Sequence, residues 1–341
     1  MTTWSIVGIA LGAVVLAAGV FIGGFGLTRV SNIKSEAQRA EQIIAESDAI
    51  FARVSASGKT AFTVLVENHA CAAPGGVQAS HGISILVERD GSAFLLDLGE
   101  DDLYSRSAQI LGKDPRAVDF AFISHGHFDH GGALAHFLES NPLAPVYVNR
   151  TAMMNRLFVK IAGVIRKDVS LDAALVDRYP GRFVFSASTI EIAPDIFVVP
   201  AIACRHPLPT GNANLFKEGS GSLVADDFDH ESLLVIRDAE GLIVFSGCCR
   251  NGILNVLDTV RAEFPDVPIK AVIGGFHLFN PVLAKIAEDP EYVRTLGETM
   301  LASEGTLFIT GHCTGTEAYG LLKEILGDRL AYFSAGREFK L

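Results

Sequence analysis

Three histidines and one aspartate are clustered within six consecutive residues in the first half of the sequence. The run His125-Gly126-His127-Phe128-Asp129-His130 follows residues 118–123, a largely apolar segment with the composition of a β-strand. Glycines in and after the run let the backbone turn sharply at the end of that strand. Neutral imidazole and carboxylate groups are the usual protein ligands of zinc and similar metals. Because chance rarely gathers such groups so closely, we interpret the run as a metal site rather than as a polar turn.

The spacing within the run is suited to two metal ions. His125 and His127 can converge on one ion, while Asp129 and His130 reach a second ion beside it. Two ions about 3.5–4 Å apart can share a bridging water and lower its pKa toward about 7. Asp129 is expected to orient this water as well as to bind metal. The run therefore predicts hydrolytic chemistry with Asp129 as the catalytic residue.

The same run carries a family resemblance that extends from about residue 61 to the C-terminus. The pattern His-x-His-x-Asp-His after a strand resembles the signature of the metallo-β-lactamase superfamily. That superfamily includes a dihydropterin-phosphate-synthase-like branch, named for joining a dihydropterin to a ribosylaminobenzene phosphate. Five further stretches resemble this branch, namely residues 81–84, 95–99, 226–228, 274–278 and 311–315.

The resemblance points to metal ligands outside the run. His312 follows an expected strand over residues 307–309, and it is the expected partner of Asp129 and His130 on the second ion. A capping or core histidine is the alternative. Cys248 follows an expected strand over residues 242–245, where the superfamily places a bridging carboxylate. A thiolate is a strong zinc ligand at about 2.3 Å, but cysteine is also among the most commonly buried residues, so a core role stays open.

Arg250 departs from the branch pattern. The branch usually reads Gly-Cys-Ser-His where this chain has residues 247–250, and that histidine would complete the shell of the first metal. Protonated arginine has no free lone pair and cannot replace it. We therefore expect one tightly bound Zn²⁺ and a second, weaker ion, although other divalent metals also suit these ligands. Arg250 would instead grip a phosphate or carboxylate of the substrate, or be a surface residue at the start of a helix.

Two histidines are further candidates for the substrate site. His277 follows an expected strand over residues 271–273, and in the branch this residue lines the substrate pocket. His206 lies in the loop after an expected strand over residues 196–199, where other superfamily members place a metal ligand. We assign His277, Arg250 and His206 to substrate binding, with coordination of the first metal as the alternative for His206.

The remaining polar candidates receive structural interpretations. Asp97 is expected to hold the metal loop by hydrogen bonds rather than to bind metal. His69 and His81 flank a glycine-rich loop and could rim the site, whereas His136 and His230 are interpreted as solvated helix and turn residues.

The N-terminus differs in character from the rest of the chain. Residues 2–28 contain no charged side chain, and this run exceeds the ~20 residues needed to cross a membrane. It predicts one transmembrane helix within residues 1–30 that contacts the lipid bilayer through residues 4–28, with a cleaved signal peptide as the alternative. Arg29, Lys34 and Arg39 follow the run, so the positive-inside rule places the remaining chain in the cytoplasm. The predicted location is the membrane, with a single pass.

After this run, the spacing of apolar residues predicts an amphipathic helical linker over residues 31–59 and a catalytic domain over residues 60–341. Short strands and helices alternate through the domain, and tight turns pair many of the strands. Residues 151–176 are expected to be largely helical, and residues 205–230 to form a lid or a disordered loop. The alternation fits a mixed α/β (α+β) fold, the four-layer αββα sandwich of a metallo-β-lactamase-like domain.

Composition narrows the partners. The net charge of −11 over 341 residues argues against nucleic acid, because binding phosphate backbones requires a basic face. A small-molecule substrate is expected, and an anionic one would need local positive charges. The five dispersed cysteines are not typical of a disulfide framework. Nothing in the sequence indicates the oligomeric state.

These features predict a membrane-anchored hydrolase in which a metal-bound hydroxide attacks an ester or phosphodiester-type small molecule. Two alternatives stay open. One is a transferase resembling the synthase after which the branch is named. The other is a non-catalytic metal- or ligand-binding sensor whose first metal site has degenerated at Arg250.

Overall fold

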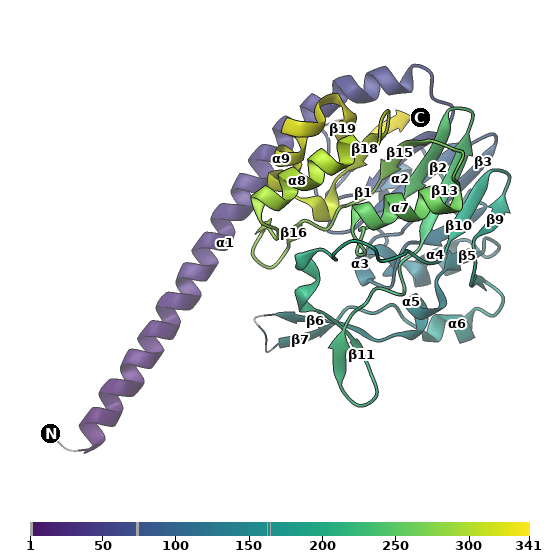
Figure 1. The fold of residues 1–341 in the computed structure, drawn as a ribbon. Helices are drawn as coiled ribbons and strands as arrows, with labels where there is room; N and C mark the ends of the chain where they lie inside the picture. Colours follow the sequence, from purple (N-terminus) through teal and green to yellow (C-terminus); the bar gives the residue numbers. More distant parts are fainter. Residues whose placement is uncertain (1–2, 73–74, 162, 164) are drawn as a thin grey trace.

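Two seven-stranded sheets face each other at the centre of the molecule (Figure 1). The structure is a computed structural model that describes residues 3–72, 75–161, 163 and 165–341, and for residues 3–27 the backbone alone. The first sheet has the order β20 (Glu338–Lys340), β1 (Ala61–Val66), β2 (Ser84–Arg89), β3 (Ser92–Leu96), β4 (Phe120–Ile123), β5 (Val146–Val148) and β8 (Phe183–Val184). The second has the order β19 (Leu330–Tyr332), β18 (Leu307–Thr310), β15 (Ile269–Ile273), β14 (Gly241–Phe245), β13 (Leu233–Asp238), β10 (Ile196–Val199) and β9 (Ile190–Ala193).

Both sheets change from antiparallel to parallel pairing along their width. In the first sheet, β1, β2 and β3 pair antiparallel, and β3, β4, β5 and β8 pair parallel. The second sheet repeats this arrangement, with β9, β10, β13 and β14 antiparallel and β14, β15, β18 and β19 parallel. The carboxyl ends of parallel strands meet at one edge of a sheet, and ligands bind there in open α/β folds. The loops that leave β3, β4, β14, β15 and β18 are therefore well placed to build a site.

Helices cover the outer face of each sheet. One outer core joins the second sheet to α7 (Ile253–Glu263), α8 (Pro290–Leu301) and α9 (Thr316–Leu326). The other joins the first sheet to α2 (Leu103–Ile110), α4 (Leu134–Ser140), α5 (Arg150–Met154) and α6 (Ala174–Arg178). A third core, which includes Phe94, Phe122 and Phe245, lies between the sheets. Strands covered on both faces are apolar along their length, as the fully buried β14 shows. These three cores confirm the predicted αββα sandwich.

Helix α1 (Thr3–Ser55) runs without a break past the predicted boundary at residue 30. Its C-terminal half lies along α9 and the end of the first sheet (Figure 1). Ile43 joins the outer core beside α9, whereas Ile50 and Phe51 enter the core between the sheets. This half of α1 is thus packed as part of the domain.

The predicted membrane anchor needs correction. The expected span, residues 4–28, falls almost entirely on side chains outside the described part of the structure. Among the described residues, no helix combines the length and the apolar character that crossing a bilayer requires. The described side chains of α1 begin at Thr28, at the end of the predicted span. This finding contradicts the predicted single-pass membrane location, whereas contact with the lipid bilayer through residues 4–28 stays a prediction.

A small third sheet replaces the helix expected over residues 151–176. Among the described residues of this stretch, only α5 and α6 are helical, and β6 (Leu157–Ile161) pairs antiparallel with β7 (Ile165–Asp168). The loop expected as a lid or as disorder supplies β11 (Leu215–Glu218) and β12 (Leu223–Ala225), which complete the order β12-β11-β6-β7. Phe158, Val159 and Ile161 favour extended backbone and pair with the neighbouring β7, but the second partner of β6, β11, lies far along the chain. Local periodicity could not show that partner.

Candidate active site

The His-x-His-x-Asp-His run lies at the carboxyl end of β4 and enters the short helix α3 (Phe128–Gly131). All four potential ligands in the run are buried, namely His125, His127, Asp129 and His130. Gly126 is required by close packing, since a Cβ atom there would lie 2.8 Å from both the Ala152 carbonyl oxygen and Leu157 Cδ1. The loop is thus held against α5 and β6.

Asp97, just after β3, fixes the orientation of this loop. Its carboxylate accepts hydrogen bonds from the Ser124 N–H (2.7 Å), the Ser124 hydroxyl (2.8 Å) and Nδ1 of His130 (2.6 Å). Donation from Nδ1 leaves Nε2 of His130 free to coordinate an ion. Asp97 also has a φ of +53°, a backbone conformation that costs free energy and persists where the surroundings enforce it. The predicted role of Asp97 in hydrogen bonding is confirmed.

Three strand ends of the second sheet bring further residues to this loop. Cys248 follows β14, His277 follows β15, and His312 follows β18. The Sγ atom of Cys248 lies 3.1 Å from Nε2 of His130. The Nε2 atom of His312 lies 3.3 Å from Oδ2 of Asp129. The six residues predicted to bind metal are therefore brought together from both sheets.

Glu67 and Asn68, which follow β1, hold His312 in place. Nδ1 of His312 lies 3.0 Å from Oδ1 of Asn68, so Nδ1 is the donor and Nε2 faces Asp129. The His312 N–H donates to Oε1 of the buried Glu67 at 2.5 Å. Sequence reasoning missed both residues, although their place directly after a strand is the signal that singled out the others.

Three buried imidazole nitrogens in the described chain lack a hydrogen-bond partner. They are the Nε2 atoms of His125, His127 and His312. An unpaired polar atom in the interior costs free energy, and coordination to a cation would remove that cost. Burial lowers the pKa of His125 and His127 well below the ordinary histidine value. Both rings are therefore neutral, which is the form that binds metal.

The surrounding donor atoms also fit a metal. Ligand atoms lie within 4.8 Å of one another in several groups at this place. These groups are His125–His130–Cys248, Cys248–His312–Cys313, His81–Asp129–His312 and His127–Asp226–His230. Burial raises the pKa of the Cys248 thiol to about 12, so a nearby cation would be needed to hold it as a thiolate. His81, which was expected at the rim, lies with its Nε2 atom 3.3 Å from Oδ2 of Asp129. Imidazole, carboxylate and thiolate together are a donor set that zinc favours.

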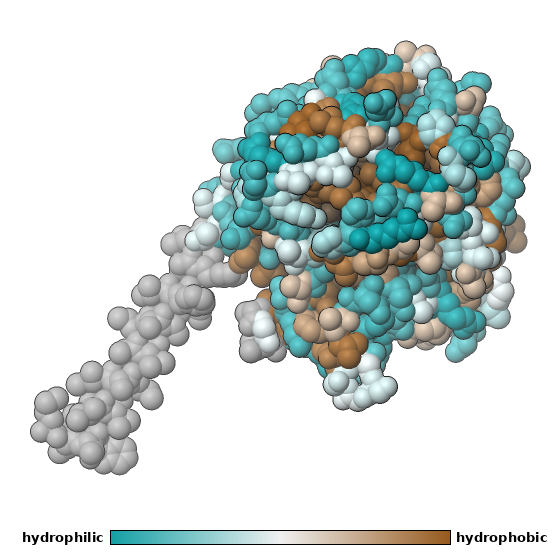
Figure 2. All heavy atoms as spheres, in the orientation of Figure 1, coloured by the Kyte–Doolittle hydropathy of each residue, from teal (hydrophilic) through white to brown (hydrophobic). Residues whose placement is uncertain are grey.

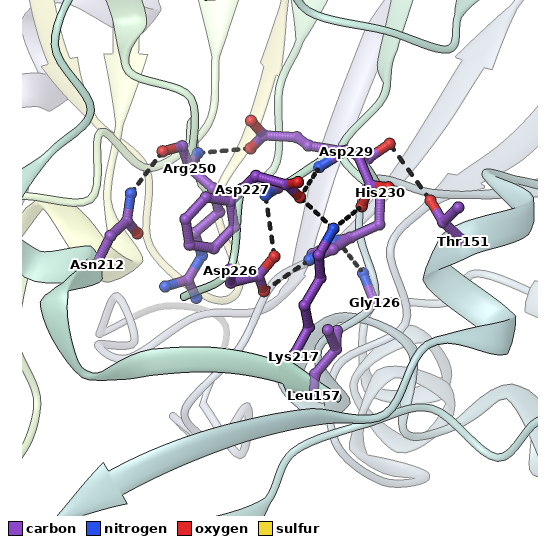
Figure 3. A network of polar contacts seen from close by, with 12 residues as sticks. Gly126, Thr151, Leu157, Asn212, Lys217, Asp226, Asp227, Asp229, His230 and Arg250 are labelled. Atoms are coloured by element: carbon purple, nitrogen blue, oxygen red, sulfur yellow. Dashed lines mark hydrogen bonds and ion pairs between the residues drawn. The ribbon is translucent and has the colours of Figure 1, made fainter. Parts of the chain in front are cut away.

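His230 is buried behind the metal loop (Figure 3). The sequence had instead predicted a solvated residue. Its Nδ1 atom accepts a hydrogen bond from the Gly126 N–H at 3.2 Å, and its Nε2 atom lies 3.1 Å from Oδ2 of Asp226. Both ring nitrogens are thus engaged, and His230 supports the loop between His125 and His127. The prediction of a solvated residue is wrong. The stretch 226–228, quoted for its resemblance to the branch, was the available signal.

Arg250 and His277 face each other in a pocket beside the metal residues. Arg250 is only 7% exposed, so the alternative of a surface arginine is excluded. Its Nη1 atom lies 3.1 Å from both ring nitrogens of His277. The same pocket is lined by His81, His127 and Asp129, and by apolar side chains that include Phe128 and Val159. The structure therefore places two of the three predicted substrate contacts together.

His206, the third predicted substrate contact, lies outside this pocket. Its Nε2 atom is 2.9 Å from Oδ2 of Asp258 on α7. The side-chain oxygen of Asn255 accepts the N–H groups of Arg205 and His206, which ties the loop after β10 to the same helix. Neither the substrate role nor the metal role of His206 is retained.

The geometry agrees with the comparisons to known proteins. The family model described as "Metallo-beta-lactamase superfamily" matches residues 79–248, from the loop before β2 to Cys248. The chain belongs to the metallo-β-lactamase superfamily. A curated relative in Methanocaldococcus jannaschii is named 7,8-dihydropterin-6-methyl-4-(beta-D-ribofuranosyl)-aminobenzene-5'-phosphate synthase. The chain is 27% identical to this synthase over 279 residues, which cover 77% of the chain and 90% of the synthase.

Solved structures show the same fold. Tm1679, described as a metal-dependent hydrolase of the beta-lactamase superfamily, is 28% identical with a TM-score of 0.68, and the match covers 83% of this chain and 99% of Tm1679. Unliganded yeast PDE1 is 10% identical with a TM-score of 0.51, covering 83% of this chain and 100% of PDE1. At that identity the likeness concerns the fold alone.

Proposed function

We propose that this protein is a metal-dependent hydrolase that cleaves an ester or phosphodiester-type bond in a small molecule. The observation that carries the proposal is a set of three buried, unpartnered imidazole nitrogens, from His125, His127 and His312. The Nε2 atom of His312 lies 3.3 Å from the Asp129 carboxylate, and Asp129 and His127 line one pocket. A divalent cation bound there would lower the pKa of a coordinated water toward about 7 and polarise the substrate. The description of Tm1679 as a metal-dependent hydrolase supports the same reaction class.

The residues divide between two ion positions. Asp129, His130 and His312 would hold a tightly bound Zn²⁺, because Asp97 and Asn68 orient two of these ligands. His125, His127 and Cys248 would hold a second ion more weakly, since Arg250 cannot donate an electron pair. Asp129 lines the pocket and would also orient the nucleophile toward the substrate.

A synthase-like group transfer is the second candidate. It is favoured by the relationship to the methanogen synthase, which extends over 90% of that protein's length. Hydrolysis and transfer would use the same metal residues and differ in what occupies the pocket.

Turnover of defined substrates separates these candidates. The full-length protein is tested with p-nitrophenyl esters and bis(p-nitrophenyl) phosphate, and separately with a dihydropterin plus a ribofuranosylaminobenzene phosphate. We expect chromogenic turnover that a chelator or Asp129→Ala abolishes, while the exposed control Asp266→Ala retains it. Conversion of the pterin pair alone would establish the synthase. No turnover of either kind by a protein carrying metal would contradict both and favour the sensor.

A further inference from the structure

The guanidinium of Arg250 is a buried positive charge that the described part of the fold does not neutralise. No carboxylate oxygen of the described residues forms an ion pair with it, and its Nε atom has no hydrogen-bond partner. Its Nη1 atom lies 3.1 Å from both ring nitrogens of His277. An isolated charge in the interior costs several kcal/mol unless an opposite charge joins it.

The nearby carboxylates are committed elsewhere. The two oxygens of Glu231 accept the Arg250 N–H at 2.6 Å, the Asn251 N–H at 2.8 Å and Nδ2 of Asn251 at 2.9 Å. Glu231 therefore binds the main-chain N–H of Arg250 rather than its guanidinium. The Oδ2 atom of Asp129 lies 3.3 Å from both His81 and His312. Neither carboxylate forms an ion pair with the guanidinium, and an anionic ligand in the pocket would supply a direct counter-charge.

The guanidinium lines a cavity of about 120 Å³ that it shares with His127, Asp129 and His277. This cavity adjoins a second one of about 440 Å³, because Phe128, Val159 and Pro281 line both. The walls of the outer cavity are mostly apolar, with positive charge from Arg29 and Lys167. Apolar atoms also show at the surface over the small sheet, at the bottom of the view in Figure 2. A ligand would thus meet apolar walls outside and one buried cation inside.

We propose that Arg250 and His277 form an anion-binding subsite, and that the substrate is an anionic ester whose uncharged part is apolar. The anion, a carboxylate or a phosphate, would accept two N–H bonds from the guanidinium, which is planar and presents its donors as a fork. The uncharged part would occupy the outer cavity between the small sheet and Pro281. This inference rests on the proposed hydrolase and names the substrate class that its pocket fits.

His277 is held rigidly for this role. Its φ of +53° is unusual for a residue with a side chain. A Cβ atom on Gly211 would lie 3.2 Å from Nε2 of His277, so a larger residue there would press on the ring. The ring therefore fixes the guanidinium against which the anion docks.

Calorimetric binding of small aromatic probes tests the subsite without requiring turnover. Phenyl phosphate and phenylacetate represent the two anions, and benzyl alcohol is the neutral probe. We expect the full-length protein to bind at least one anion roughly tenfold or more tightly than benzyl alcohol, the size expected for hydrogen bonds to a charged group. The anion that binds more tightly identifies the charged group of the substrate.

Variants assign the effect to one side chain. Arg250→Gln should bind the anion roughly tenfold or more weakly than the wild type, with little change in the affinity for benzyl alcohol. The anion affinity of Arg250→Lys should lie between those of the wild type and Arg250→Gln. Arg205→Gln, the same change at an exposed position, should bind like the wild type. If the glutamine variant does not fold, Arg250→Lys decides the question. Metal content is measured in every sample, so that only variants with unchanged metal are compared.

The outcomes separate this inference from the proposed hydrolase. Anion affinity that is unchanged in the Arg250 variants overturns the subsite. Anion binding that is lost on adding a chelator but is the same in the Arg250 variants and the wild type overturns it as well. Anion binding that depends on Arg250, without turnover of any ester, would retain the subsite and contradict the hydrolase.

Discussion

At the scale of single residues, Arg250 and the histidine usual in the related branch would serve different chemistry at the same position. Arginine offers donors to an anion, whereas imidazole offers a lone pair to a metal. We predict that Arg250→His raises the occupancy of the weaker metal position and lowers the affinity for phenyl phosphate by roughly tenfold. Zinc titration and phenyl phosphate titration by calorimetry measure both effects. Two tight zinc ions already present in the wild type would contradict the first.

Asp97 provides a second test, because it touches the metal loop without lining the pocket. Asp97→Asn replaces one acceptor oxygen with a donor opposite Ser124 and His130. We expect metal affinity to fall about 10–100-fold, the usual effect of losing a partner that orients a ligand. Asp266→Asn, at an exposed position, is the matched control. Equal zinc affinity in the two variants would show that Asp97 does not orient His130.

The sequence predicted which ligand-type residues follow strands. It did not predict which residues from distant segments contact and support them. His125, His127, Asp129, His130 and His312 were identified because ligand-type side chains recur directly after apolar runs. Support from Glu67 and His230 depends on contacts between segments far apart in the chain, for which spacing carries no signal. His206 was misplaced for the converse reason, because Asn255 and Asp258 on another element draw its loop away.

At the scale of secondary structure, Glu36 links α1 to α9, the helix that follows His312 along the chain. The Glu36 carboxylate accepts the N–H and the hydroxyl of Thr316 at 2.7 and 2.6 Å, at the N-terminus of α9. Burial alone would raise the pKa of Glu36, but hydrogen bonds from His69 and Thr316 outweigh it and lower the pKa. Burial likewise opposes the charge on His69, yet the hydrogen bond with Glu36 and the charge of Glu67 raise the pKa of His69.

These shifts define the pH range in which Glu36 stabilises the fold. The lowered pKa of Glu36 gives stability that is complete above its unfolded pKa of 4.5 and is lost as the pH falls through the folded pKa. The raised pKa of His69 gives stability that is complete below 6.5 and is lost as the pH rises through the folded pKa. We predict that Glu36→Gln lowers the free energy of unfolding by about 1–2 kcal/mol, most strongly between pH 4.5 and 6.5.

Urea unfolding of Glu36→Gln across this pH range measures the effect. Glu41→Gln, an exposed position on the same helix, should unfold like the wild type. A stability difference that does not vary with pH would mean that the Glu36 and His69 charges do not contribute.

Secondary structure could be predicted wherever local pattern and tertiary packing agree. The expected strands over 196–199 and 242–245 coincide with or fall within β10 and β14, because each buries a continuous apolar segment. Residues 157–168 were misread as helix because β6 pairs with β11, which is distant in sequence, as well as with the adjacent β7. Pairing over such a distance overrides local propensity.

At the scale of the whole molecule, α1 belongs to the catalytic domain. Phe51 is buried between the sheets, and its ring stacks on Phe339 of β20 with centroids 4.7 Å apart. We predict that Phe51→Ala lowers the free energy of unfolding by about 3–5 kcal/mol, the usual cost of removing a buried aromatic ring. Leu143→Ala, at a position 86% exposed, should change it by less than about 0.5 kcal/mol.

Chemical unfolding of both variants provides the comparison, and equal stabilities would contradict the packing of α1 in the core. The same contacts mean that a chain beginning after residue 56 would lack part of its core. Binding and activity are therefore measured on the full-length protein.

Zinc binding by the full-length protein tests the metal centre most directly. After treatment with a chelator and dialysis, the wild type and Asp129→Ala are titrated with zinc by calorimetry. We predict one tight zinc ion and a second, weaker one in the wild type, with the tight ion lost in Asp129→Ala because its carboxylate is a ligand. The metal centre would be contradicted by a wild type that binds neither zinc nor any other divalent metal. It would also be contradicted by an Asp129→Ala variant that binds zinc as tightly as the wild type.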